Sequence, residues 1–156
     1  MIISIVENLP DEDLVTKLLL RNPSDVEAVL RPLYGPEKAA KFASLFTEHL
    51  TLAAQLVKAA KPGDNTAAAK LEKRWHVNVD KIAAFLNRIN PYFSKKALMT
   101  MLHKHPALTK AEAVSRLNKD YASDIAWYDK IEKQALIMAD AMTDGIVKQF
   151  PDIFKR

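Results

Sequence analysis

The chain has 156 residues and no cysteine, so its fold depends on packing alone and disulfide-stabilised classes are excluded. A domain of this length buries about 68–70% of its unfolded surface, which is enough for one core in a single domain covering residues 1–156. The net charge of +4, from 23 basic and 19 acidic residues that are mostly interleaved, indicates an ordinary solvated surface.

Targeting and membrane signals are missing from the sequence. No run approaches the roughly 18 consecutive apolar residues of a membrane span. Residues 1–6 are apolar, but they lack the basic region and the cleavage site of a signal peptide. They resemble the end of an amphipathic helix whose beginning is absent, so we expect a truncated or very short first helix. The expected location is the cytoplasm, without membrane insertion.

Proline, glycine and capping residues divide most of the chain into helices. Asn22-Pro23 looks like a helix start, Gly35-Pro36 separates two segments, and Lys61-Pro62-Gly63-Asp64 forms a tight turn between two long periodic runs. Asn90-Pro91 ends the second long run, and Ser94 can cap the helix that follows. The expected helices cover residues near 11–21, 23–34, 36–61, 65–89, 94–105 and 110–149.

The last two predicted helices depend on Pro106. The residue before a proline is pushed out of the α region, so we expect a helix to end at His105-Pro106. Thr109 and Glu112 have the spacing of a capping box, which predicts that the final helix begins near residue 110. Weak helix formers at 118–123 predict a bend in that final helix.

The predicted fold class is all-α. No window shows the sustained two-residue alternation of a strand. The loops between the long helices are short, which makes neighbouring helices antiparallel. We therefore expect an antiparallel helical bundle of four main helices with short N-terminal helices added.

His49 and Asn78 are polar residues on otherwise apolar helix stripes. Leaving such a group buried without a partner costs roughly 1–3 kcal/mol, so each must be hydrogen-bonded or bind a ligand. In an antiparallel hairpin centred on residue 63, positions at equal distances from the turn face each other. This register predicts that His49 lies beside Asn78, with Trp75 one turn away.

Further polar residues extend this prediction to a pocket. Asp124 stands between Tyr121 and Tyr128 on the inward stripe of the last helix, and His105 closes the stripe of the helix before it. If these faces converge, they form a polar pocket in the bundle core, where ligand and metal sites of helical bundles are built. The candidate metal ligands are His49, His105 and Asp124, and the candidate ligand-binding residues are Asn78, Trp75, Tyr121 and Tyr128.

Two interpretations of this pocket stay open. Imidazole and carboxylate ligands suit zinc, iron, manganese or nickel, so a divalent transition metal is one occupant to consider. The other interpretation is a buried hydrogen-bond network in which a neutral His49 is held by Asn78 or a tyrosine hydroxyl. The ligand spacing does not decide between them, because the Glu-x-x-His of di-iron bundles is absent.

No catalytic motif accompanies the pocket. There is no glycine-rich phosphate loop and no recognisable Ser–His–acid spacing, which argues against a kinase or dinucleotide enzyme and leaves any reaction unassigned. Glu72, His76 and Asp80 form a row that could hold a metal but is more typical of a solvent-exposed ladder. Residues 95–119 are locally basic, yet they lack aromatic interleaving, so nucleic acid is not the expected partner.

A family resemblance covers nearly the whole chain. The segments that carry it include Leu9-Pro10-Asp11-Glu12, Thr47-Glu48-His49-Leu50, Arg74-Trp75-His76-Val77-Asn78, Leu108-Thr109-Lys110-Ala111-Glu112-Ala113 and Gln149-Phe150-Pro151. They resemble a family of small bacterial all-helical proteins that are loosely named acetylglutamate kinase or glycosyltransferase, although neither a phosphate loop nor a sugar-nucleotide fold is found here. Members carry an extra N-terminal segment with a further histidine, and the resemblance implies a bundle similar to the DinB-like fold. It implies no activity.

Two functions from different classes follow. The first is a helical-bundle protein that binds a metal ion or small ligand in its polar pocket, around His49. The second is a structural or interaction module that associates with itself, as a homodimer, through an exposed helix face.

Overall fold

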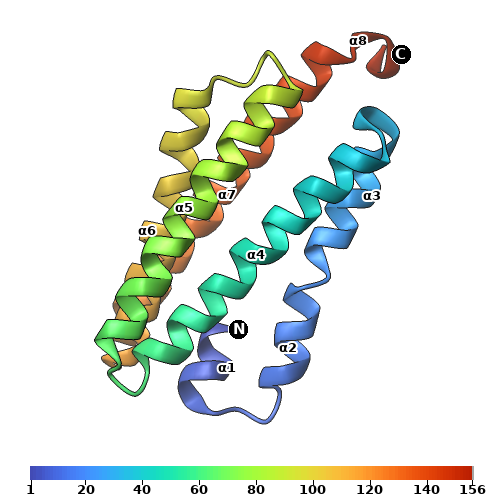
Figure 1. Ribbon diagram of the computed structural model, residues 1–156. Helices are drawn as coiled ribbons and strands as arrows, with labels where there is room; N and C mark the ends of the chain where they lie inside the picture. Colours follow the sequence, from blue (N-terminus) through green and yellow to red (C-terminus); the bar gives the residue numbers. More distant parts are fainter. Residues whose placement is uncertain (156) are drawn as a thin grey trace.

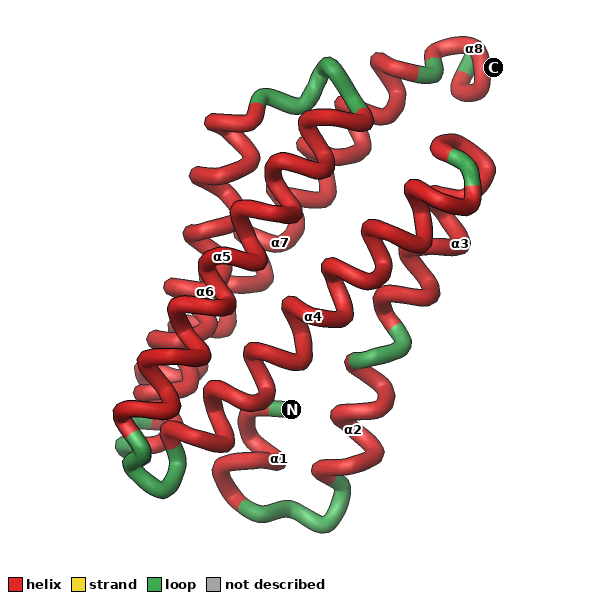
Figure 2. The backbone as a smooth tube through the Cα atoms, in the orientation of Figure 1, coloured by secondary structure: helices red, strands yellow, loops and turns green. Residues whose placement is uncertain are grey.

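Helices follow one another through residues 1–155, the part of the chain that the computed structural model describes, and no strand occurs there (Figures 1 and 2). In chain order they are α1 (Ile2–Glu7), α2 (Glu12–Leu19), α3 (Asn22–Tyr34), α4 (Pro36–Ala60), α5 (Asn65–Ile89), α6 (Lys95–Leu117), α7 (Tyr121–Gln149) and α8 (Pro151–Phe154). The prediction of an all-α fold is confirmed.

The four long helices α4 to α7 run alternately in opposite directions, so that each is antiparallel to the next (Figure 1). Helices α2 and α3 follow one another along α4, and α1 packs against α4 and α6 at the end where the α4–α5 turn lies. Among the helices of residues 1–155, none has both the length and the apolar character that crossing a membrane requires.

The turns use the residues that their geometry demands. Gly35 (φ 80°) separates α3 from α4, and Gly63 (φ 82°) lies in the α4–α5 turn; both adopt the positive φ that glycine tolerates best. The side chain of Asp64 accepts a hydrogen bond from the backbone N–H of Ala67 at 2.9 Å and so caps α5. These features confirm the predicted hairpin.

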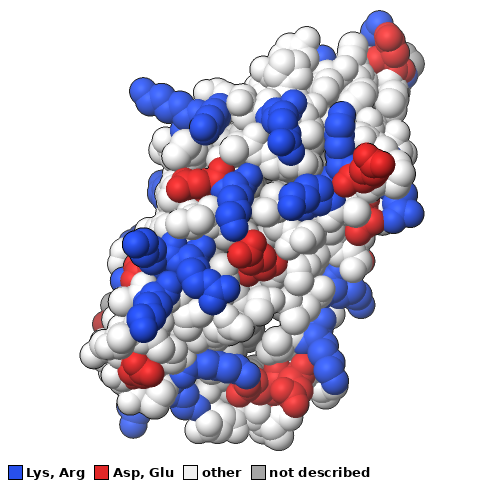
Figure 3. All heavy atoms as spheres, viewed as in Figure 1, with Lys and Arg blue, Asp and Glu red and all other residues white. Residues whose placement is uncertain are grey.

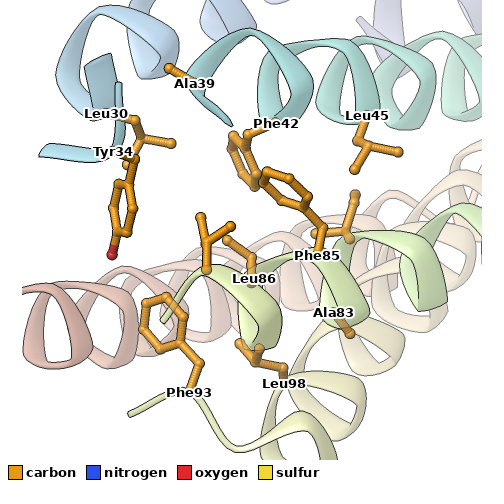
Figure 4. Packing of buried hydrophobic residues seen from close by; sticks show 12 residues of the cluster. Leu30, Tyr34, Ala39, Phe42, Leu45, Ala83, Phe85, Leu86, Phe93 and Leu98 are labelled. Atoms are coloured by element: carbon orange, nitrogen blue, oxygen red, sulfur yellow. The ribbon is translucent and has the colours of Figure 1, made fainter. Parts of the chain in front are cut away.

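The largest apolar cluster joins α3, α4, α5 and the start of α6 (Figure 4). Its buried members are Leu30, Tyr34, Ala39, Phe42, Leu45, Ile82, Ala83, Phe85, Leu86, Ile89, Phe93 and Leu98. At its edge the Tyr34 hydroxyl donates to Gln149 Oε1 at 2.9 Å and accepts from Asn90 Nδ2 at 3.0 Å. This network ties the C-terminal end of α7 to the α3–α4 corner.

The prediction that a helix ends at His105-Pro106 is wrong. Helix α6 continues to Leu117 with a buried Pro106 inside it, and Thr109 lies within the helix, where its hydroxyl donates to the His105 carbonyl at 2.9 Å. Burial of the proline ring compensates for the one backbone hydrogen bond that it cannot make. The chain breaks instead at 118–120, where Lys119 has a φ of 60° and Asp120 caps α7. The bend predicted near 118–123 is therefore a helix boundary.

Candidate functional site

His49 of α4 is held by Asn78 of α5, as the hairpin register predicts. Its Nδ1 lies 3.1 Å from Asn78 Oδ1. Asn78 is fully buried, and its Nδ2 donates to the Leu45 carbonyl at 3.0 Å and to Glu48 Oε2 at 3.1 Å. Because both amide hydrogens are used, the amide oxygen faces His49 and requires an N–H on Nδ1. The Nε2 atom of His49 is thereby left as a hydrogen-bond acceptor.

His105 of α6 repeats this arrangement with a glutamine of α7. Its Nδ1 lies 2.8 Å from Gln134 Oε1, and Gln134 Nε2 donates to the Met101 carbonyl at 2.9 Å. The buried Gln134 therefore fixes the same tautomer, and Nε2 of His105 is also an acceptor. Sequence analysis missed Gln134 because it was not placed on the inward stripe of the last helix.

Burial keeps both imidazoles neutral at pH 7. Desolvation lowers the pKa of His49 to about 4, and the hydrogen bond to Asn78 opposes this only in part. Desolvation also lowers the pKa of His105, against the opposing effect of Gln134. Each neutral ring offers a nitrogen that accepts a hydrogen bond. The two rings therefore suit a ligand group that donates a hydrogen bond better than they suit an anion.

The two histidines line one large cavity of about 590 Å³, contributed mainly by α4, α5, α6 and α7. Most of its other lining side chains are apolar; they include Phe42, Phe46, Val79, Ile82, Leu86, Leu102, Ile131, Met138 and Met142. Its volume falls within the range of small-molecule sites, which combine an apolar lining with a few fixed polar groups. Tyr128 is 55% exposed, which places it at a rim that is open to solvent.

Glu112 is a third polar residue of this cavity, and sequence analysis missed it. Burial, together with the nearby negative charge of Asp124, raises the pKa of its carboxyl to about 7. The residue was interpreted as part of a capping box. In a helix that continues through Pro106, however, the spacing of His105, Thr109 and Glu112 places all three on one stripe.

Trp75 lines the cavity close to His49, with the two ring centroids 5.3 Å apart. Its buried Nε1–H has no hydrogen-bond partner among residues 1–155. A buried donor without an acceptor is costly, so Trp75 is held at this position by the packing of its ring and not by a hydrogen bond. Trp75 also borders a second cavity of about 230 Å³.

Asp124 and Tyr121 do not join this cavity. Asp124 Oδ2 accepts a hydrogen bond from Arg116 Nη1 at 3.1 Å, and the same guanidinium lies over the Tyr121 ring at 4.8 Å and beside Glu7. The break at 118–120 places both residues in the first turn of α7 rather than midway along a helix. Within residues 1–155 no three His, Asp or Glu side chains group in a way that could hold a metal ion. The expectation that Asp124 completes a site with His49 and His105 is thus not met.

The basic stretch of 95–119 is partly neutralised in the fold. Lys110 pairs with Glu72 at 2.7 Å, and Arg116 pairs with Glu7 and Asp124. On the face shown in Figure 3, basic side chains are more numerous than acidic ones, but the two signs are interspersed. On this face, therefore, the charges are mixed and no continuous groove of one sign is seen.

Comparison with known proteins gave no relative of this chain. No protein-family model matches it, and neither a curated protein nor a solved structure does. The resemblance to the small bacterial helical family stays a prediction, and any function has to be argued from the cavity itself.

Proposed function

We propose that this protein binds a small amphiphilic molecule, with an apolar body and one hydrogen-bond donor group, in the cavity between α4, α5, α6 and α7. The observation that carries the proposal is a cavity of about 590 Å³ whose apolar lining is interrupted by His49, His105 and Glu112. The orientation of both imidazoles by buried amides supports it, because a preorganised polar group costs little to use in binding.

The charge of the cavity narrows the ligand class. Neutral His49 and His105 present acceptors, and Glu112 is partly ionised at neutral pH, so the polar groups favour a donor such as an amine or alcohol over a carboxylate. We favour an organic ligand over a metal ion here, because Asp124, the expected third ligand, pairs with Arg116 outside the cavity, and the cavity lining is mainly apolar. No reaction is proposed.

Three probes with the same ten-carbon chain and different head groups test this assignment: decylamine, 1-decanol and decanoate. A Trp127→Phe background leaves Trp75 as the only tryptophan, so a ligand in the cavity changes the tryptophan emission. We expect decylamine and decanol to bind and decanoate to bind at least about tenfold more weakly, which corresponds to about 1.4 kcal/mol. Equal binding of all three, or no binding of any, would contradict the proposal.

Matched variants of α7 locate the binding. Ala135 lines the cavity, so Ala135→Phe fills it and should abolish binding of decylamine. Ala139 is exposed on the same helix, so Ala139→Phe makes the same chemical change outside the cavity and should leave the affinity unchanged. If Ala135→Phe binds as tightly as the parent, the ligand lies elsewhere.

Self-association is a second candidate function, favoured by the exposed surface of α7. The buried residues of this 29-residue helix are Asp124, Gln134 and Gly145, whereas Ile125 and Leu136 are 64% and 62% exposed. Apolar residues gathered on an outer helix are typical of a contact surface. Light scattering after size exclusion tests this function. A dimer that Leu136→Glu converts to a monomer would support self-association, and an unmutated chain that is already a monomer would rule it out.

A further inference from the structure

We propose that His76 and His103 form a binding site for a divalent transition-metal ion on the surface between α5 and α6. This site is separate from the cavity described above. It uses the two histidines of the chain that are not held by buried amides.

The two rings face each other edge to edge. Nδ1 of His76 lies 2.9 Å from Nδ1 of His103, while the ring centroids are 5.1 Å apart and the planes are inclined by 17°. Such a short nitrogen separation at that centroid distance requires each Nδ1 to point at the other. Two ring nitrogens from different helices are therefore aimed at one point between them.

Asp80 settles how the protons are placed. Its Oδ1 lies 2.7 Å from Nε2 of His103, and a carboxylate can only accept, so His103 carries its hydrogen on Nε2. Nδ1 of His103 then has a free lone pair and accepts a hydrogen bond from Nδ1–H of His76. When a metal ion takes the place of this hydrogen, His76 carries it on Nε2 instead, so no proton is gained or lost.

The distances suit a shared metal ion. Bonds of about 2.0–2.1 Å from two imidazole nitrogens to a tetrahedral zinc ion place the nitrogens about 3.3 Å apart. The observed 2.9 Å requires a slight opening of the pair and a rotation of both rings, so that lone pairs that now point at each other converge on the ion. Asp80 hydrogen-bonded to the far nitrogen of His103 repeats the carboxylate–histidine–metal arrangement, which orients the ring and raises its basicity.

Water would complete the coordination. The next acidic residue on the same row of α5, Glu72, is engaged by Lys110 at 2.7 Å. The side chains of His103 and Asp80 are 33% and 50% exposed, so a hydrated ion can reach them.

The ligand type selects the metal. Imidazole nitrogen favours copper, nickel and zinc over magnesium and calcium, which prefer oxygen.

Calorimetric titration of the full chain with Zn²⁺ alone tests the proposal. We expect one ion per chain, with His76→Ala and His103→Ala each weakening the affinity at least about tenfold and Asp80→Asn weakening it about 10–100-fold. The matched control is Lys104→Ala, a change at an exposed residue next to His103 that keeps all four histidines and should leave the affinity unchanged. Loss of binding in that control, or full binding by His76→Ala, would overturn the assignment.

An NMR titration of the unmutated chain tests the same site without variants, which could misfold. The chain has four histidines, so it gives four Hε1 resonances in the NMR spectrum. Zn²⁺ should shift those of His76 and His103 and leave those of His49 and His105 in place. An unchanged spectrum up to millimolar Zn²⁺, or shifts confined to His49 and His105, would refute the site.

Discussion

Gly145 lies where α7 packs against the loop after α5, and the structure leaves no room there for a larger residue. A Cβ atom added at Gly145 would overlap with Cε1 of Phe93 and lie 2.5 Å from its Cδ1. The Phe93 ring is 5% exposed within the largest apolar cluster, and its backbone carbonyl accepts from Asn87 Nδ2 at 2.6 Å. The ring is thus buried and its backbone is hydrogen-bonded, so Gly145→Ala should force the ring out of place.

Two opposing effects set the size of the change. Alanine is a better helix former than glycine by about 1 kcal/mol, which favours the variant. Overpacking a core costs typically about 1–3 kcal/mol, and a displaced Phe93 also loses part of the roughly 1.5–3 kcal/mol that its burial supplies. We therefore expect Gly145→Ala to lower the free energy of unfolding by about 1–2 kcal/mol. In a chain of this length that corresponds to a fall in Tm of roughly 2–8 °C.

Urea unfolding followed by circular dichroism measures this change. Gly145→Ala in a Phe93→Ala background is the control, because without the ring only the gain in helix propensity remains and the added methyl group should stabilise by up to about 1 kcal/mol. The sign of the effect should thus reverse between the two backgrounds. If Gly145→Ala is as stable as the parent, the close approach of α7 to Phe93 is refuted.

Two further predictions concern pH. The folded-state pKa of His49 is about 4, below its ordinary 6.5, so the stability it contributes is present above pH 6.5 and is lost as the pH falls toward 4. His49→Gln should remove a pH-dependent part of the free energy of unfolding on the order of 2–3 kcal/mol between pH 7 and 4.5, and an unchanged pH dependence in urea titrations would contradict this. The pKa of Glu112 is raised to about 7, so its contribution is full below pH 4.5 and is lost as the pH rises through 7. Glu112→Gln should therefore raise Tm relative to the parent more at pH 8 than at pH 5, and an equal difference at both values would refute the raised pKa.

The sequence by itself determined the parts of this protein that depend on local chemistry. Gly63 and Asp64 specify where the long hairpin turns, and an antiparallel pair has one register once its turn is set. That register alone places His49 beside Asn78. Helix periodicity and short loops likewise sufficed for the all-α fold.

Tertiary structure decided where helix α6 ends, and with it the composition of the cavity. Proline disfavours a helix locally, but the buried ring of Pro106 gains packing that no local pattern reveals, so the helix continues. This continuity brings Glu112 into the cavity beside His105 and moves Asp124 to a helix start beside Arg116.

The His76–His103 pair was equally hidden from the sequence. It depends on how far α5 and α6 are rotated about their own axes, and that rotation is chosen by the packing of both helices at once. A stripe on one helix shows which residues share a face. Only the assembled bundle shows what that face meets, because contacts between helices are set by the summed packing of the core rather than by either helix alone.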